Sequence, residues 1–139
     1  MRFDVLSIFP EMFDAVYSAG ITGRAAAKAL WTLHRWNPRD YASNPYRRVD
    51  DRAYGGGPGM VMLVDPMTQA LEASRLETEN AGLTPGPVVL MSPQGHPLNH
   101  QKVTDFASYQ SITLVSGRYE AIDQRFIDRQ IDEEVSIGD

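Results

Sequence analysis

The sequence predicts an α/β fold with a mainly parallel sheet and helices on both faces. Apolar or β-branched runs alternate with segments of helical periodicity four or five times along the 139 residues. This alternation is typical of parallel strand–helix units. The first run is too continuously apolar for a sheet with one solvated face, as expected where helices cover both sides. The length and the 42% hydrophobic content fit one domain with an ordinary packed core.

The N-terminal part predicts a strand, two helices and a second strand. The expected ranges are 2–9, 11–19, 24–30 and 31–36. Pro10 follows the first apolar run and suits the first turn of a helix, and apolar residues then recur at helical spacing. Alanines favour the second helix, which Gly20 and Gly23 should separate from the first.

The stretch 37–59 is expected to be irregular and rich in arginine. Its prolines and the glycine run 55–59 exclude long regular elements. About twenty irregular residues in a compact domain are usually functional or disordered. Five arginines and three aspartates between Arg35 and Arg52 give a local charge of +2, against −5 for the whole chain. The stretch is either a solvated loop or a phosphate-contacting one, because arginine forks match phosphate oxygens.

The C-terminal half predicts further helices and strands in alternation. Asp65 and Pro66 have the residue types of an N-cap and a first helical position, and their helix should end near Leu76. Asn99 is a second cap candidate. The other expected elements are a strand over 88–91, a strand over 112–115, a helix around Phe126 and a strand over 134–137.

Composition and missing motifs exclude several classes of protein. Without cysteine there are no disulfides or thiolate metal sites, which agrees with a cytoplasmic location. No apolar run approaches the roughly 18 residues of a membrane span, and the first residues do not form a secretory signal. The chain has no phosphate-binding P-loop, no dinucleotide-binding glycine motif and no hydrolase elbow. The three histidines lack carboxylates at metal-ligand spacing, so no metal site is predicted.

Turn sequences at three expected strand ends predict the functional site. They lie at 92–95, 116–120 and 136–139. Ligands of open parallel sheets bind outside the carboxyl ends of the strands. Gly95, Gly117 and Gly138 suit a sharp turn or a close approach of backbone to ligand. Each glycine alone is most simply a turn residue, whereas three at one sheet edge favour a pocket for a purine ring.

Glu120 is the most specific single candidate for a residue that recognises a nucleic-acid base. It follows Arg118 and Tyr119 at a strand end, and its carboxylate offers two acceptors side by side. Guanine presents two donors side by side, at N1 and at the N2 amino group, whereas adenine has an acceptor at N1. A good bidentate contact discriminates between bases by about 1–3 kcal/mol. The alternative is an ion pair between Glu120 and a nearby arginine.

With these loops in view, the sequence resembles the bacterial tRNA (guanine-N1)-methyltransferases of the trefoil-knotted SPOUT superfamily. The matching strings, between Phe3 and Asp139, are FDVLSIFPEMF, VDDRAYGGGPGM, LMSPQG, SGRYEAID and IDEEVSIGD. The resemblance implies a cytoplasmic homodimer without membrane attachment. Its reaction transfers a methyl group from S-adenosylmethionine to N1 of the guanine just 3′ of the tRNA anticodon. The resemblance also leaves room for Mg²⁺ bound together with the tRNA.

The resemblance assigns roles to single residues. The implied cofactor-binding residues are Leu90, Met91, Ser92, Pro93, Gly117, Tyr119, Ile137, Gly138 and Asp139. The implied substrate-binding residues are Glu120, Arg118, Arg52, Gly57 and Gly59, with Glu120 recognising the target guanine. At Ala121 the family usually has glycine, a mild change if φ is negative at this residue.

The resemblance further predicts that residues 1–139 are an incomplete S-adenosylmethionine-binding domain of SPOUT type. Family members continue with the rest of the trefoil knot, a general-base aspartate, an assisting arginine and a helical tRNA-binding domain. We therefore expect an incomplete knot, no catalytic base within the chain, and no activity from these residues alone. Two alternatives remain open. One is a catalytically inert, dimerising cofactor-binding module, and the other is a related SPOUT methyltransferase that acts on ribosomal RNA.

Overall fold

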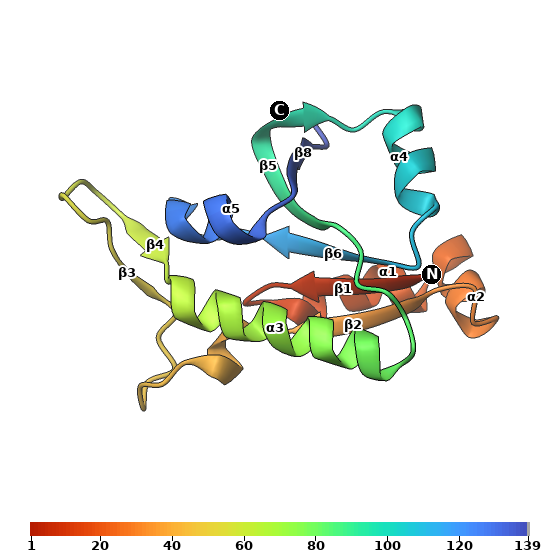
Figure 1. Ribbon diagram of the computed structural model, residues 1–139, viewed down its shortest axis with the longest axis horizontal. Coiled ribbons are helices and arrows are strands. Elements are labelled where there is room, and N and C mark those ends of the chain that lie inside the picture. The colour runs from red at the N-terminus through yellow and green to blue at the C-terminus, as the bar shows by residue number, and fades with distance from the viewer. Residues whose placement is uncertain (139) are drawn as a thin grey trace.

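The computed structural model describes residues 1–138 and confirms the parallel α/β fold (Figure 1). The main sheet has the strand order β2-β1-β6-β5-β8, and every neighbouring pair is parallel. Its strands are β1 (Arg2–Leu6), β2 (Thr32–Trp36), β5 (Val88–Pro97), β6 (Ser111–Ser116) and β8 (Glu133–Ser136). The carboxyl ends of these strands therefore point toward one side of the molecule.

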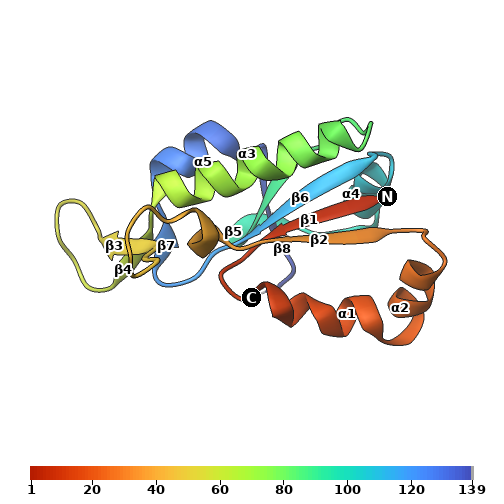
Figure 2. The ribbon, with the colours of Figure 1, turned by 90° about the horizontal axis from the view of Figure 1, so that it is seen from below.

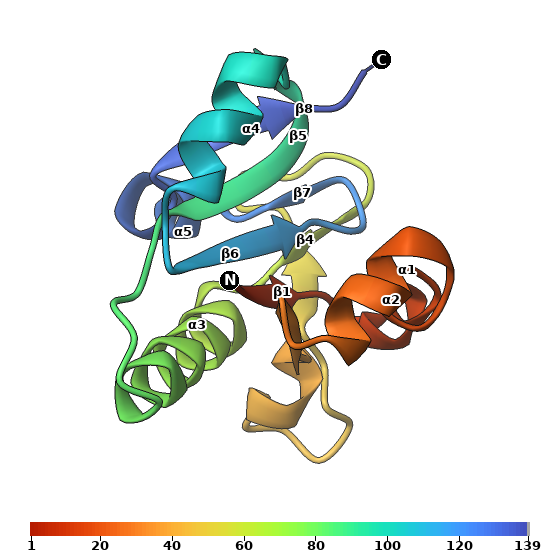
Figure 3. The same ribbon diagram turned by 90° about the vertical axis from the view of Figure 1, so that its right-hand side faces the viewer.

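Helices cover both faces of this sheet, as the sequence predicts. Figure 2 shows α3 (Val64–Asn80) and α5 (Gln124–Gln130) across the sheet from α1 (Asp14–Ser18) and α2 (Gly20–Ala27). Figure 3 shows the same separation from the side. Leu6, Met67 and Phe126 belong to the core beneath α3 and α5. On the opposite face, Phe106 of α4 (His100–Ala107) packs against Ile112.

A buried ion pair lies in the first strand of the sheet. Arg2 and Asp4 are 3% and 1% exposed, and their side chains meet at 2.8 Å. The Trp36 indole of β2 also donates to Asp4, at 2.7 Å. A buried charge is tolerated only when it is paired and hydrogen-bonded. The contact between Trp36 and Asp4 therefore ties the edge strand β2 to the centre of the sheet.

A second, three-stranded sheet stands beside the carboxyl ends of the main one. It consists of β3 (Asp50–Arg52), β4 (Met60–Met62) and β7 (Ala121–Ile122) in the order β3-β4-β7. β3 and β4 form an antiparallel hairpin, and β4 pairs with β7 in parallel. The expectation of an irregular stretch over 37–59 is therefore partly wrong. A 3-10 helix, η2 (Pro38–Tyr41), and β3 both lie within it.

The N-terminal helices differ from the expected ranges. β1 ends at Leu6 rather than at residue 9, and a 3-10 helix, η1 (Pro10–Phe13), precedes α1. Gly20 and Gly23 lie inside α2 instead of separating two helices. A side chain at position 23 would place its Cβ 2.6 Å from the backbone carbon of Ser18. Glycine here therefore allows the close contact between α1 and α2.

Two later elements are longer than predicted. Leu63, not Asp65, is the N-cap of α3, and this helix continues past Leu76 to Asn80. β5 runs through the expected turn at 92–95 and reaches Pro97, with an irregularity in its pairing with β8 between Met91 and His96. The predicted turn is thus a bulge within one strand. The Asn99 cap of α4 is confirmed, since its side chain accepts a hydrogen bond from the Lys102 amide.

Candidate active site

A cavity of about 410 Å³ lies beside the bulge of β5 and the carboxyl end of β6. Its lining comes from β5, the segment after β6, β7, α5 and β8. The lining residues are Leu90, Met91, Ser92, Pro93, Gln94, Gly117, Arg118, Tyr119, Glu120, Ala121, Ile122, Gln124, Ile127 and Glu134. The volume falls within the roughly 300–1,000 Å³ of small-molecule sites. Both apolar and polar side chains line it.

The cavity brings together most of the predicted cofactor-binding residues. These are Leu90, Met91, Ser92, Pro93, Gly117 and Tyr119. Ile137 and Gly138 follow β8 and do not line the cavity, while Asp139 lies outside the described residues. The bulge of β5 and the segment after β6 therefore meet at one place, whereas the described residues of the third predicted loop, Ile137 and Gly138, do not line the cavity.

The bulge in β5 shapes one wall of the cavity. A Cβ at Gly95 would lie 2.4 Å from the backbone nitrogen of Val135 and 2.5 Å from the carbonyl carbon of Glu134. Only glycine allows the two strands to approach so closely at this point. Just before it, the Ser92 hydroxyl accepts a hydrogen bond from the Gln94 amide at 3.2 Å, which closes a local turn. The segment 92–94 is consequently displaced from the ladder toward the cavity.

Tyr119 forms a strained part of the opposite wall. It has a positive φ of 61°, which non-glycine residues rarely adopt and which often marks functional sites. Its hydroxyl accepts a hydrogen bond from Nη2 of Arg39 at 3.2 Å. Arg39 belongs to η2, so this bond connects the arginine-rich stretch to the cavity wall. The neighbouring Ala121 has no positive φ, and alanine is therefore unstrained at the position where the family usually has glycine.

Glu120 stands at the mouth of the cavity and is exposed. Its amide donates to the Met60 carbonyl at 3.1 Å, which fixes its backbone against β4. Gly59 lies directly beside its side chain. Within residues 1–138, the ion pairs do not include Glu120. The alternative role, an ion pair with a nearby arginine, is thus not formed in the described part of the chain.

The other predicted substrate-binding residues are placed differently from one another. Arg118 lines the cavity, but its guanidinium lies 5.1 Å from the centre of the Phe9 ring and donates to Sδ of Met12. Its positive charge is therefore directed toward η1. Arg52 and Gly57 lie in the β3–β4 hairpin and do not line the cavity.

Several lining residues were not predicted from the sequence. Gln124 and Ile127 share one face of α5 because they are three residues apart, and this spacing was the available signal. Gln94 stands inside the LMSPQG string, next to residues that were predicted. Arg39 does not line the cavity but was predicted within the arginine-rich stretch; its bond to Tyr119 had no local signal, since the two residues lie 80 positions apart in the chain.

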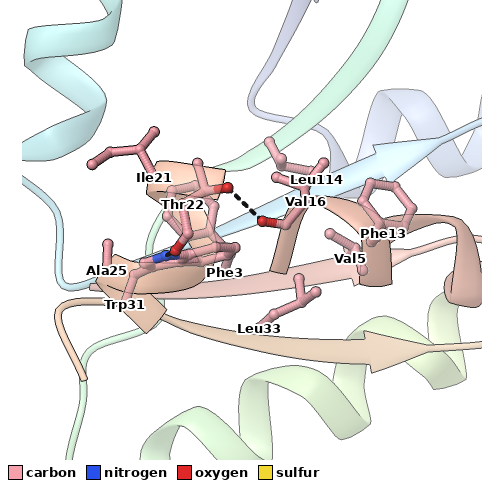
Figure 4. A pocket seen from close by; sticks show the side chains of 10 residues that line it. All are labelled: Phe3, Val5, Phe13, Val16, Ile21, Thr22, Ala25, Trp31, Leu33 and Leu114. Carbon is pink, nitrogen blue, oxygen red and sulfur yellow. Dashed lines mark hydrogen bonds between the residues drawn. The ribbon is translucent and has the colours of Figure 1, made fainter. Parts of the chain in front are cut away.

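A second cavity, of about 460 Å³, lies between the helices α1 and α2 and the main sheet (Figure 4). Its lining is apolar apart from Trp31 and Thr22, whose polar groups are already hydrogen-bonded to the protein backbone. Nothing in it can orient a polar ligand. The cavity beside Glu120 is therefore the better candidate for chemistry.

The described residues contain neither a cluster suited to a metal ion nor a helix suited to a membrane span. Within 1–138, no three His, Asp or Glu side chains gather closely enough to hold a metal ion. None of the helices in this range combines the length and hydrophobicity needed to cross a membrane.

Comparisons with known proteins assign the chain to a family. The family model described as tRNA (Guanine-1)-methyltransferase TrmD matches residues 1–139. A tRNA (guanine-N(1)-)-methyltransferase from Ralstonia nicotianae is 56% identical over 139 residues, which are all of this chain and 52% of the relative. One from Polynucleobacter necessarius is 52% identical, with 100% of this chain and 56% of the relative covered.

A solved structure agrees with these sequence matches. The crystal structure of a tRNA methyltransferase from Aquifex aeolicus superposes with a TM-score of 0.81 at 34% identity, covering 100% of this chain and 60% of that one. The chain spans about half the length of the curated relatives that it matches. On the family model and these relatives, the chain belongs to the tRNA (guanine-1)-methyltransferase TrmD family.

Proposed function

We propose that residues 1–139 are the S-adenosylmethionine-binding domain of a longer enzyme. Its reaction is methylation of N1 of the guanine just 3′ of the tRNA anticodon. The relatives' names state tRNA guanine-N1 methylation for those proteins. The observation that carries the proposal to this chain is the position of Glu120. A carboxylate without an ion-pair partner in the described residues stands at the mouth of a cavity lined by the bulge of β5 and the segment after β6.

The cavity fits S-adenosylmethionine in size and lining. Apolar side chains such as Leu90, Ile122 and Ile127 suit the faces of an adenine ring. Backbone groups of the β5 bulge at 92–94 can bond the ring edge, and Glu134 adds a carboxylate that favours the cationic sulfonium. When bound, the cofactor supplies an electrophilic methyl group. The assignment of Ile137, Gly138 and Asp139 to this site remains a prediction.

Glu120 recognises the target base in this proposal. Guanine N1 carries a proton at neutral pH and becomes nucleophilic when a base removes it. The Glu120 carboxylate accepts hydrogen bonds from N1–H and the N2 amino group, and so holds the flipped base by its Watson–Crick edge. Proper alignment of N1 with the methyl group is itself a large part of such catalysis. The general base lies outside this chain in the proposal.

The arginine-rich stretch supplies the contact with the tRNA backbone. Arg39, Arg47, Arg48 and Arg52 lie on η2, the following loop and β3, beside the same end of the sheet as Glu120. Their guanidinium groups match phosphate oxygens. Mg²⁺ bound with the tRNA phosphates belongs to the same proposal, since its ligands would come largely from the nucleic acid.

We propose a cytoplasmic homodimer, with the surface around α1 and α2 as part of its interface. Val16 and Ile21 line the apolar cavity there and are 53% and 75% exposed. Exposed apolar patches of this kind commonly mark protein–protein contacts. Sedimentation of the full-length protein should give the mass of a dimer, and Val16→Asp should shift it toward the monomer. A wild-type monomer at micromolar concentration would contradict the proposed dimer.

Two measurements test the proposed reaction. Calorimetry should detect binding of S-adenosylhomocysteine to the full-length protein, and absence of binding would contradict the proposal. Glu120→Gln replaces one acceptor by a donor and removes a charged hydrogen bond. Such a bond contributes about 1.5–3 kcal/mol, so methylation should fall by about 10- to 150-fold. Cofactor affinity should stay near wild type.

Two comparisons separate the alternatives. The first compares methylation of transcribed tRNAs with and without guanine 3′ of the anticodon. Methylation only of the tRNA that carries this guanine supports the proposed activity over methylation of ribosomal RNA. Assay of the 139-residue chain alone tests whether this part is inert by itself, as we expect.

A further inference from the structure

Gly59 and Glu120 occupy adjoining space although they belong to different segments. Gly59 has a φ of +84° and immediately precedes β4. A Cβ built on it would lie 2.1 Å from Cγ of Glu120, 2.8 Å from Cδ and 2.9 Å from Oε1. Non-bonded carbons normally stay about 3.5–4.0 Å apart. The Glu120 side chain therefore fills the space that any side chain at position 59 would need.

The backbones on either side of this contact are fixed to each other. The Glu120 amide donates to the Met60 carbonyl at 3.1 Å. The next residues continue as a parallel ladder, in which Val61 pairs with Ala121 and Met62 with Ile122. Since neither backbone can slide freely along the other, a group added at position 59 would displace the Glu120 side chain rather than the whole segment.

We infer that Gly59 is a positioning residue for Glu120, which sets the direction of its carboxylate by leaving the adjacent space free. The inference rests on the proposed function, in which that carboxylate must meet two donors on guanine. An exposed glutamate has several staggered conformations of similar energy. With glycine at position 59, Cγ, Cδ and Oε1 of Glu120 can occupy the space that a Cβ would take, so that the conformation needed for bidentate contact is available before the base arrives.

The other glycines of the same loop allow the positioning role of Gly59 to be distinguished from the role of a simple turn residue. Gly55 and Gly56 have φ values of +88°, close to that of Gly59, and Gly57 has +117°. A Cβ on any of these three would meet no atom within 4 Å. Gly56→Ala therefore imposes the same backbone strain as Gly59→Ala without touching Glu120, and it is a matched control.

The first test compares Gly59→Ala with Gly56→Ala in the full-length protein. Methylation of tRNA should have a kcat/KM at least about tenfold lower in Gly59→Ala than in Gly56→Ala. Affinity for S-adenosylhomocysteine should be equal in both. In Gly59→Ala alone, the ratio of kcat/KM for tRNA with guanine to kcat/KM for tRNA with inosine at the target position should also fall, because inosine lacks the N2 amino group. A purely structural role would not change this ratio. Equal activity and an equal ratio in the two variants would overturn the inference.

The second test is a double-mutant cycle that remains informative if Gly59→Ala folds poorly. Glu120→Ala removes all three atoms that the new Cβ would contact. Gly59→Ala should therefore lower the melting temperature less in the Glu120→Ala background than in wild type, and should cause no further loss of activity there. Additive effects on both quantities would overturn the inference. Failure of the wild-type enzyme to methylate guanine N1 would instead overturn the proposed function, and the inference with it.

Discussion

Gly95→Ala should destabilise the protein by about 2–4 kcal/mol. The added Cβ would lie 2.4 Å from the Val135 nitrogen, 2.5 Å from the Glu134 carbonyl carbon and 2.7 Å from the Glu134 oxygen. These are backbone atoms of a buried strand, so no side-chain rotation relieves the contact. Overpacking of this kind typically costs about 1–3 kcal/mol.

The neighbouring strand pairing adds to this cost. Beyond the bulge, the ladder resumes with His96 opposite Val135, and the Leu98 amide donates to the Ser136 carbonyl at 2.7 Å. If the strands move apart, such hydrogen bonds are weakened, and each contributes about 1 kcal/mol. Because Glu134 also lines the cavity, affinity for S-adenosylhomocysteine should fall in the same variant.

Urea unfolding followed by tryptophan fluorescence measures this effect. The Trp36 indole is hydrogen-bonded to the buried Asp4 and so reports on the sheet. Gly117→Ala is the matched control, because its Cβ would meet only the flexible end of the Ile122 side chain, at 3.4 Å. Its unfolding free energy should change by less than about 1 kcal/mol. Equal midpoints for Gly95→Ala and Gly117→Ala would refute the argument from close strand approach.

Three further predictions concern stability. Phe126→Ala should lower the free energy of unfolding by about 3–5 kcal/mol in urea titrations, since Phe126 is fully buried in the core under α3 and α5. Ala29→Gly should raise it by about 1 kcal/mol, because Ala29 has a φ of 57° just after α2, where glycine is unstrained; a lower melting temperature would contradict this. A hydrogen bond from Arg125 lowers the pKa of Asp123 below its ordinary value of 3.8. The ionised Asp123 therefore stabilises the folded protein above that ordinary pKa, and this stabilisation is lost as the pH falls through the lower pKa of the folded state. Asp123→Asn keeps the cap of α5, and its melting temperature should fall less steeply than that of wild type below about pH 4.

The main sheet was predictable because its strands carry strong local signals. Residues 112–115 and 88–91 are short, strongly apolar runs, and both lie in observed strands, β6 and β5. Their ends were marked by serine, glycine and proline. The same marks predicted that the turns at 92–95, 116–120 and 136–139 form one site. Residues 92–94 and 117–120 line one cavity, whereas Ile137 and Gly138 do not.

The second sheet was not predictable from local pattern. β3 and β4 have three residues each and β7 has two, too few to establish an alternating pattern. They form because Met62 and Ile122 are buried side by side in the core, a contact between segments sixty residues apart. The same reason explains the missed bond between Arg39 and Tyr119. Tertiary pairing, rather than propensity, decides the structure of this part of the chain.

The division into two sheets has a consequence for how the site works. Gly117 follows directly from β6 of the main sheet, whereas Glu120 is fixed three residues later by Met60 of the hairpin. In the proposed function, the cavity that would hold the cofactor depends mainly on β5, β6 and β8, and the carboxylate that would recognise guanine depends on β4. Changes in the hairpin should alter base recognition with little effect on cofactor affinity, whereas changes at the β5–β8 junction should do the opposite. Under this proposal, separate supports explain how one short segment, 117–120, can serve two ligands whose positions must be set independently.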